Sequence, residues 1–157
     1  MDALHLEDIN IIKVLPKQLF FKGKDIDTED LFKNTPLIGL YFGAKWCPPC
    51  QGFNPVLKNI YKKVNEKEKV LEIIYCSSDE DVEDYVDFLK NSNWPAISYN
   101  SDKLEEVGEV FGIEDIPQLI IFNSKGKLID LNGRKAVQKN GINGIKTWLE
   151  KENKKLK

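Results

Sequence analysis

The chain has 157 residues, which fits one globular domain. Its composition, with 41% hydrophobic and 31% charged residues, is that of an ordinary soluble globular protein. A formal net charge of −2 supplies no basic field for nucleic acid, so we exclude nucleic-acid binding as the function.

The sequence predicts a cytoplasmic protein with one domain over residues 1–157. Its core spans about residues 10–150, between a short N-terminal extension and a lysine-rich C-terminal extension. No apolar run approaches the roughly 20 residues that span a bilayer, and the acidic start lacks the features of a secretion signal, so no membrane association is expected. Three cysteines, one close pair and one single residue, fit a reducing compartment better than a disulfide framework. We expect a monomer.

The first part of the chain predicts short strands followed by a buried one. Residues 9–15 and 19–21 read as short strands, and residues 25–32 as a helical turn. The apolar run 37–42 is too short for a helix and predicts a central strand. Apolar side chains then repeat at helical spacing from Pro48 to about residue 66, which predicts a long amphipathic helix.

Residues 70–76 predict a second strand, and residues 77–81 the start of a second helix with Ser78 as its N-cap. The apolar face of that helix is expected to comprise Val82, Tyr85, Val86 and Leu89. Residues 94–99 predict a short strand. A further helix is expected to stop near Gly112.

Residues 117–122 and 127–131 flank a turn at 123–126 and predict a hairpin, and apolar residues from Ile142 to Leu149 predict a closing helix. The order of elements implies a right-handed parallel crossover and an antiparallel edge. The predicted fold class is therefore α/β, with a mixed central β-sheet flanked by helices on both faces.

The pair in Cys47-Pro48-Pro49-Cys50 is the most informative feature of the sequence. It lies where the predicted buried strand turns into the long helix, a context that favours a redox dithiol over a chance Cys-x-x-Cys. A thiolate attacks disulfides, and a helix N-terminus favours negative charge on Cys47. Pro48 suits the first helical position because it has no N–H. We expect Cys47 to be the nucleophile in an exposed turn and Cys50, deeper in the helix, to be the resolving thiol.

The residues outside this pair offer few alternatives. A zinc site would need two more ligands, and only Cys76 and His5 remain, neither in a paired arrangement, so no metal is expected. Cys76 ends an apolar strand and is interpreted as a packing residue. Trp46 is expected to flank the site. Lys45 and Asp79 either tune the thiol or are plain surface residues, and the sequence leaves both open.

Several motifs follow one another in a fixed order along the chain. They are Trp46-Cys47-Pro48-Pro49-Cys50, Phe53-Asn54-Pro55, a strand ending in Cys76, Asp79-Glu80-Asp81, Trp94-Pro95 and Ile116-Pro117. In this order they resemble the thioredoxin superfamily, and most closely its tryparedoxin and nucleoredoxin branch, in which Trp-Cys-Pro-Pro-Cys is typical. The resemblance covers about residues 10–150 and implies a thioredoxin-like fold.

The resemblance also implies roles for single residues. Cys47 would be the exposed nucleophile and Cys50 the resolving thiol. Pro117 would be a cis-proline facing the disulfide, with Ile116 offering backbone groups to an extended partner segment. Pro55 would be the kink proline of the active-site helix. The expected substrate-binding surface comprises Trp46, Pro48, Pro49, Ile116 and Pro117.

Three positions bear on the branch. Tyr41 falls where ordinary thioredoxins carry a buried acid that assists proton transfer, and tryparedoxins also lack that acid. Gln51 replaces the basic residue that usually follows the second cysteine. Ser78 stands where tryparedoxins commonly have a Trp. The last two departures leave open whether trypanothione is the reductant.

The resemblance implies a thiol-disulfide oxidoreductase that reduces protein disulfides, such as those of peroxiredoxins, through Cys47 and Cys50. The redox-active disulfide is its own redox centre, so no separate cofactor is expected. A low-molecular-weight dithiol such as trypanothione, glutathione or a flavin reductase would supply electrons, in a direction set by the reduction potential. The alternatives are a protein-interaction module with little redox turnover, against which Pro117 and the intact pair argue, and a peroxidase, whose Thr/Arg setting around the nucleophile is absent.

Overall fold

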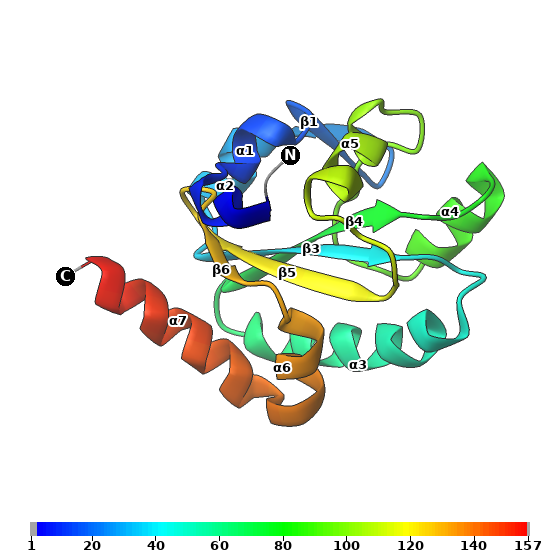
Figure 1. The fold of residues 1–157 in the computed structure, drawn as a ribbon. Coiled ribbons are helices and arrows are strands. Elements are labelled where there is room, and N and C mark those ends of the chain that lie inside the picture. The colour runs from blue at the N-terminus through cyan, green and yellow to red at the C-terminus, as the bar shows by residue number, and fades with distance from the viewer. Residues whose placement is uncertain (1–2, 157) are drawn as a thin grey trace.

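A four-stranded mixed sheet forms the centre of the computed structural model, which describes residues 3–156 and the side chains of residues 6–152. The strands lie in the order β4-β3-β5-β6. Their bounds are β3 Leu37–Gly43, β4 Leu71–Ser77, β5 Gln118–Asn123 and β6 Leu128–Asp130. β3 pairs with β4 in parallel and with β5 antiparallel, and β5 pairs with β6 antiparallel (Figure 1). The expected mixed sheet and hairpin are confirmed.

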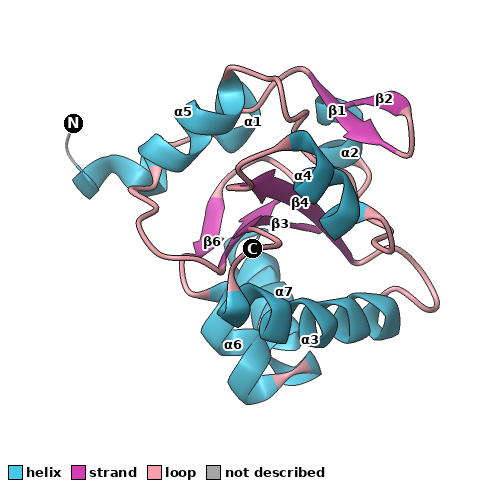
Figure 2. Ribbon diagram, turned by 90° about the vertical axis from the view of Figure 1, so that its right-hand side faces the viewer, coloured by secondary structure: helices cyan, strands magenta, loops and turns pink. Residues whose placement is uncertain are grey.

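Helices cover both faces of this sheet, as Figures 1 and 2 show. One face carries α3 Pro48–Val64, α6 Gly133–Asn140 and α7 Ile142–Leu156. The other carries α1 Ile11–Val14, α2 Thr28–Lys33 and α5 Lys103–Val110. The remaining elements are the 3₁₀ helix η1 Ala3–Asp8, the hairpin of β1 Gln18–Phe21 and β2 Lys24–Asp27, and α4 Val82–Leu89, which follows β4. The predicted fold class is thereby confirmed.

Two hydrophobic cores lie on the two faces of the sheet, because successive strand residues point to opposite sides. The core under α3 takes Leu37, Tyr41, Leu71, Ile73, Tyr75, Leu119 and Ile121 from the strands. The opposite core takes Ile38, Leu40, Phe42, Ile74, Cys76, Ile120 and Phe122. β3 and β4 are buried at every position, as continuous apolar strands covered on both faces should be. Cys76 is a packing residue, as the sequence predicts.

The strand predicted over residues 9–15 is wrong, because a short helix, α1, forms there instead. Its N-cap is Asn10, whose side-chain oxygen accepts the backbone N–H of Ile12 at 3.0 Å. Asn is a strong N-cap residue, and the two residues one turn apart, Ile11 and Leu15, are both buried. The density of apolar residues concealed this capping signal.

The helical turn predicted from residue 25 is displaced toward the C-terminus. Residues 24–27 form β2, which pairs with β1 across a turn in which Lys22 and Gly23 have φ values of 49° and 81°. Positive φ at both central residues is the geometry of a tight hairpin turn. Helix α2 begins only afterwards, where Asp27 caps it by accepting the N–H of Asp30 at 3.0 Å.

The predicted start of α4 is also wrong. The N-cap is Asp81, not Ser78, and its carboxylate accepts the backbone N–H three residues further on. The expected apolar face is buried only in part, since Tyr85 is in the core whereas Val82 and Val86 are 50% and 53% exposed. α4 therefore presents two valines to solvent.

Two further segments differ from the sequence prediction. Residues 94–99 form no strand, because only Ala96 pairs, through isolated bridges with Phe20 and Tyr75 that join the β1–β2 hairpin to β4. Helix α6 was not predicted, since its core-facing residues, Gly133, Ala136 and Val137, include only one apolar side chain larger than that of alanine. The helix stop at Gly112, with φ of 59°, is confirmed. Within residues 3–156, no helix combines the length and apolar character needed to cross a membrane.

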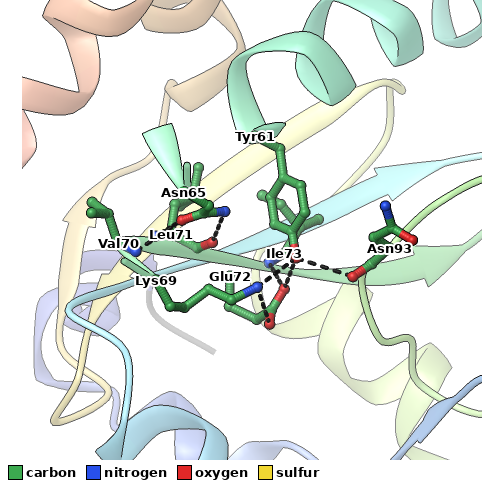
Figure 3. A network of polar contacts seen from close by, with 8 residues as sticks. All are labelled: Tyr61, Asn65, Lys69, Val70, Leu71, Glu72, Ile73 and Asn93. Atoms are coloured by element: carbon green, nitrogen blue, oxygen red, sulfur yellow. Dashed lines mark hydrogen bonds and ion pairs between the residues drawn. The ribbon is translucent and has the colours of Figure 1, made fainter. Parts of the chain in front are cut away.

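A buried polar network fastens the C-terminal end of α3 to the start of β4 (Figure 3). The Tyr61 hydroxyl donates to Glu72 Oε1 at 2.7 Å and accepts from Lys69 Nζ at 2.9 Å. The same Glu72 oxygen accepts the N–H of Ile73 at 3.0 Å, and Lys69 pairs with its other oxygen at 3.3 Å. Burial, followed by the Glu72 charge, raises the pKa of Tyr61, so its hydroxyl remains a donor. Asn65, the C-cap of α3, accepts two more N–H groups from the chain entering β4.

Replacing Tyr61 by Phe should lower the free energy of unfolding by about 1–3 kcal/mol, because a buried carboxylate oxygen loses a donor. Urea unfolding followed by tryptophan fluorescence measures the change. The matched control is Tyr99→Phe, since the half-buried Tyr99 hydroxyl makes only a 3.3 Å bond to the Asp79 carbonyl. Equal losses in the two variants would contradict a special role for the Tyr61 hydroxyl.

Candidate active site

The turn from β3 into α3 places the two cysteines at the helix N-terminus. Cys47 is the N-cap, with extended backbone angles of −90° and 113°, and its sulfur accepts the backbone N–H of Cys50 at 3.3 Å. Pro48 and Pro49 occupy the first helical positions, where the missing N–H groups cost nothing. The sulfur of Cys47 therefore faces the positive end of the helix dipole. This arrangement agrees with the predicted strand–helix context of the pair.

The Cys47 thiol is more covered than the sequence predicted. Cys50 is fully buried, as expected, but Cys47 is only 4% exposed rather than open to solvent. The two cysteines and Ala44 form a small apolar cluster, against which Phe88 and Ile116 pack. The prolines make an exposed turn, as predicted, but this packing closes over the sulfur beside them.

The environments of the two thiols differ. Burial, and then the hydrogen bond with Cys47, raise the pKa of Cys50 to about 12, against a smaller opposing effect of Arg134. Cys50 therefore rests as a thiol at neutral pH. Cys47 sits at the capping position, so the pair offers one sulfur at the helix dipole and one neutral sulfur behind it.

The segment Ile116-Pro117 lies over the dithiol and joins it to β5. The peptide bond between these residues is cis, as the resemblance implied. The carbonyl oxygen of Ile116 lies 3.7 Å from the sulfur of Cys47, within hydrogen-bond reach of a thiol. The structure thus brings the two cysteines together with Ile116, which lies 69 residues after Cys47 in the sequence.

The exposed rim of the site is made by Trp46 and the two prolines. Trp46 is 51% exposed, and its indole N–H donates to the carbonyl of Ser78 at 3.0 Å. Pro48 and Pro49 are also exposed. Gln51 donates its side-chain amide to the carbonyl of Lys45. Two of the rim side chains are therefore fixed to the backbone of the active-site loops.

Asp79 holds the loop in front of the dithiol. Its carboxylate is buried and accepts the Lys45 N–H at 2.6 Å, the Ser77 hydroxyl at 2.6 Å and the Tyr75 hydroxyl at 2.7 Å. Burial, followed by Asp79, raises the pKa of Tyr75, which keeps that hydroxyl protonated and donating. The open question on Asp79 thus has a structural answer: it acts as a positioning clamp between β4 and the residue before Trp46.

The side chain of Lys45 points to α4 instead of the thiols. Its ammonium pairs with Asp87 at 2.7 Å and with Asp84 at 3.7 Å. The hydrogen bond with Asp87 raises the pKa of Lys45. The sequence left open whether Lys45 tunes the dithiol, and these contacts commit its charge elsewhere.

Tyr41 is fully buried on β3 under the dithiol, at the position where the resemblance implied a missing acid. Its hydroxyl donates to the side chain of Asn54 in α3 at 3.1 Å. Burial, and then the charges of Cys50 and Cys47, raise the pKa of Tyr41. The phenol therefore keeps its proton and supports α3, and it supplies no base to the dithiol.

Arg134, at the first turn of α6, was not singled out from the sequence. Its guanidinium donates to the carbonyl of Pro117 at 3.3 Å, and its charge acts on Cys50. One signal was available, because Arg134 is the single arginine in a chain that otherwise uses lysine as its basic residue.

The remaining candidates lie apart from this site. Burial raises the pKa of Cys76, whose sulfur contacts the carbonyl of Ile74 at 3.7 Å. The His5 side chain lies outside the described side chains. Among the residues that the structure describes, there is no group of three or more His, Cys, Asp or Glu side chains arranged to hold a metal.

Comparison with known proteins gives one family. A family model described as thioredoxin-like matches residues 35–128. A tryparedoxin from Trypanosoma brucei brucei is 35% identical over 131 residues, which cover 81% of this chain and 89% of that protein. Probable nucleoredoxin 1 from Arabidopsis thaliana is 35% identical over 115 residues, which cover 73% of this chain. The chain spans only 20% to 31% of the nucleoredoxins from Arabidopsis thaliana, Danio rerio and Oryza sativa.

Solved structures of tryparedoxins have the same fold. The tryparedoxin from Trypanosoma brucei matches with a TM-score of 0.75 and 32% identity, over 83% of this chain and 92% of that one. Tryparedoxin I from Crithidia fasciculata matches with a TM-score of 0.75 and 27% identity, over 84% and 92%. The sequence relatives and the structural neighbours thus agree with the branch that the motifs indicated.

Replacing Asp79 by Asn should destabilise the protein by about 1–3 kcal/mol, because an amide NH₂ would face groups that now donate to a carboxylate. It should also increase the mobility of Trp46, which follows the clamped residue, and so lower its fluorescence anisotropy. Urea unfolding and the fluorescence anisotropy of Trp46, read in a protein whose other tryptophans are phenylalanine, measure the two effects. The exposed Glu80→Gln is the matched control, and an Asp79→Asn protein indistinguishable from it would contradict the clamp.

The burial of Cys50 should make it a slow nucleophile at neutral pH. In the Cys47→Ser protein, its alkylation by iodoacetamide should be at least about tenfold slower than in the same protein unfolded in guanidinium chloride, where a thiol has a pKa near 8.5. Because burial raises the pKa of Cys50 in the folded protein, its alkylation rate should continue to increase with pH above about 8.5, where the rate in the unfolded protein levels off. Peptide mass spectrometry separates Cys50 from Cys76, and equal folded and unfolded rates would contradict the protected thiol.

Proposed function

The chain belongs to the thioredoxin-like family, in its tryparedoxin and nucleoredoxin branch, and from this premise we propose that it reduces disulfide bonds of partner proteins through Cys47 and Cys50. The observation that carries the proposal is the geometry of this pair. The Cys47 sulfur caps α3 and accepts the N–H of Cys50, while the second thiol lies one turn inside the helix. All three cysteines of the chain are free thiols.

The first step is an attack by the Cys47 thiolate on one sulfur of the partner disulfide. A bond forms between that sulfur and Cys47, the partner disulfide breaks, and the leaving partner thiolate takes a proton from water. The N–H of Cys50 and the helix dipole favour negative charge on the attacking sulfur. The covered position of Cys47 restricts the reaction to segments that can displace or slide past Ile116.

The second step releases the partner. Cys50 loses its proton to solvent and attacks the sulfur of Cys47, the mixed disulfide breaks, and the partner leaves as a second thiolate that is protonated by water. Two electrons have then passed from the dithiol to the partner, and Cys47 and Cys50 are joined by a disulfide. Because Cys50 follows Cys47 by three residues within one helical turn, this closure needs little movement.

Partner binding is assigned to the surface that surrounds the nucleophile. Trp46, Pro48 and Pro49 present exposed apolar and aromatic area on one side of Cys47. On the other side, Ile116 lies next to the sulfur and offers backbone groups to an extended segment, and the buried Pro117 holds it in place. An extended peptide laid between these two sides would have its disulfide over Cys47.

The proposed targets are protein disulfides, with those of peroxiredoxins as the class that the family resemblance implies. The proposed electron donor is a small dithiol, glutathione or a flavin reductase, which reduces the disulfide between Cys47 and Cys50. Gln51 and Ser78 lie at the rim, so they belong to the surface on which donors are distinguished. This surface lacks the basic residue after the second cysteine that the family commonly has.

The Cys50→Ser protein should trap a mixed disulfide with an oxidised peroxiredoxin, because the resolving thiol is gone while Cys47 still attacks. The Cys47→Ser protein should trap none, and both variants should reduce insulin disulfides no faster than dithiothreitol alone. Non-reducing electrophoresis and insulin turbidity measure the two effects, with Cys76→Ser as the control that keeps full turnover. Trapping by Cys47→Ser alone would reverse the two roles, and a parent protein that binds partners without turnover would be an interaction module.

A further inference from the structure

The only arginine of the chain occupies a defined place beside the active site. Helix α6 begins at Gly133, where an added Cβ would lie 2.7 Å from the carbonyl oxygen of Leu119, so only glycine allows this close approach to β5. The next residue, Arg134, is half-buried and donates to the carbonyl of Pro117 at 3.3 Å. The backbone of α6 thus holds a guanidinium against the loop that covers the dithiol.

The resolving step of the proposed reaction needs a charge that burial opposes. Cys50 must become a thiolate before it can attack the mixed disulfide. The site surrounds it with Ala44 and the half-buried Phe88 and Ile116, which solvate a thiolate poorly. Burial is accordingly the largest cause that raises the pKa of Cys50.

Few groups around Cys50 can favour its charged form. Cys47 raises its pKa, and Tyr41 from β3 is a neutral phenol. The ammonium of Lys45 is engaged by the carboxylates of α4. A backbone hydrogen bond with Ala44 and the charge of Arg134 act in the other direction and lower the pKa of Cys50.

We propose that Arg134 is a positioning residue of the resolving step, whose guanidinium anchors the Pro117 carbonyl and stabilises the Cys50 thiolate as it forms. The inference rests on the proposed function, since it concerns the second half of the same reaction. Arg134 touches neither sulfur, so it acts through the field at Cys50 and through the loop that covers it. Arginine suits this task because it stays charged at all relevant pH values and is more weakly hydrated than lysine.

The proposed step balances without a further reactant. Cys50 gives its proton to solvent, its sulfur attacks the sulfur of Cys47, and the bond between Cys47 and the partner sulfur breaks. The partner thiolate leaves with the electron pair of that bond and takes a proton from water. Arg134 keeps its charge throughout and exchanges no proton.

A mixed disulfide with thionitrobenzoate separates the two steps in the full chain. Ellman's reagent releases one equivalent of thionitrobenzoate when Cys47 attacks it and a second when Cys50 resolves the product. Stopped-flow absorbance measures both rates between about pH 6 and about pH 10, around the unperturbed thiol pKa. All proteins compared carry Cys76→Ala, so that only the two active-site thiols react.

The Arg134→Gln protein should release the second equivalent about threefold more slowly at neutral pH. Loss of one pKa unit of thiolate stabilisation removes about tenfold of the thiolate, and the higher nucleophilicity of a more basic thiolate returns about threefold. Below the pKa of Cys50 the second release follows the thiolate fraction, so the Arg134→Gln protein should reach a given rate about half a pH unit higher than the parent. Arg134→Lys should keep most of the rate and the profile, because the cation is retained.

Two comparisons separate this role from a structural one. Lys135→Gln is the matched control, since Lys135 is exposed and lines the same hollow beside Pro117 but lies one residue further along α6. It should leave both releases unchanged, and Arg134→Gln should leave the first release within about twofold because the guanidinium bonds the Pro117 carbonyl and not the sulfur of Cys47. The free energy of unfolding of each variant shows whether the fold is intact.

The outcomes discriminate between the two levels of the argument. A second release that is slowed, displaced to higher pH and rescued by lysine supports the role of Arg134. The role of Arg134 is overturned if the parent releases both equivalents but the pH profile of the second release is unchanged in Arg134→Gln. It is also overturned if Arg134→Gln slows both releases equally. Either result leaves the proposed function intact. A parent protein that releases no second equivalent overturns the proposed function, and the role of Arg134 with it.

Discussion

The hydrogen bond from the Cys50 N–H to the Cys47 sulfur is the contact on which the rest of the site depends. It makes Cys47, the proposed nucleophile, the cap of α3, so the start of the helix also fixes the position of the sulfur. A cap requires an extended residue just before the helix, and the buried strand β3 delivers the chain in that conformation. Pro48 and Pro49 contribute by having no N–H to compete for the sulfur. The sheet therefore positions the Cys47 sulfur through the single turn that joins β3 to α3.

The same geometry makes the two thiols unequal. Cys50 lies inside the helix and under the cover of Ile116, where burial keeps it protonated at neutral pH. A dithiol of this kind attacks with one sulfur and holds the other in reserve until the mixed disulfide brings its target within reach. Burial that protects Cys50 from side reactions also slows its own step, so a fixed cation such as Arg134 has a physical use there and an extra carboxylate would not.

The sequence predicts the parts of this protein that depend on local patterns. The continuous apolar runs identify β3 and β4, and the cysteine pair at a strand–helix junction identifies the active-site turn without reference to any contact. The errors occur where one polar side chain decides the structure, as with Asn10, which starts a helix inside an apolar run, and Asp81, which delays α4. The burial of Cys47 could not be predicted either, because its cover comes from Ile116, far away in sequence.

Arg134 shows the same limit from another side. Its helix, α6, faces the core with small residues, Gly133, Ala136 and Val137, which give only a weak apolar signal, and the contact with Pro117 exists because Gly133 lets the helix touch β5. The one sequence signal that pointed to this residue was composition, because Arg134 is the single arginine in a chain rich in lysine.

The two ends of α3 are fastened in different ways, and the difference matches what each end does. At the C-terminal end, the buried Glu72 carboxylate accepts from the Tyr61 hydroxyl and pairs with the exposed Lys69 ammonium, so each charge has its partner (Figure 3). At the N-terminal end, the buried carboxylate of Asp79 accepts from a backbone N–H and two hydroxyls and so holds the loop, and it is not among the groups that raise the pKa of Cys50. A carboxylate aimed at the sulfurs would raise their pKa values and slow both steps. Asp79 instead directs its oxygens at the Lys45 N–H and the hydroxyls of Tyr75 and Ser77, where they secure the geometry of the turn.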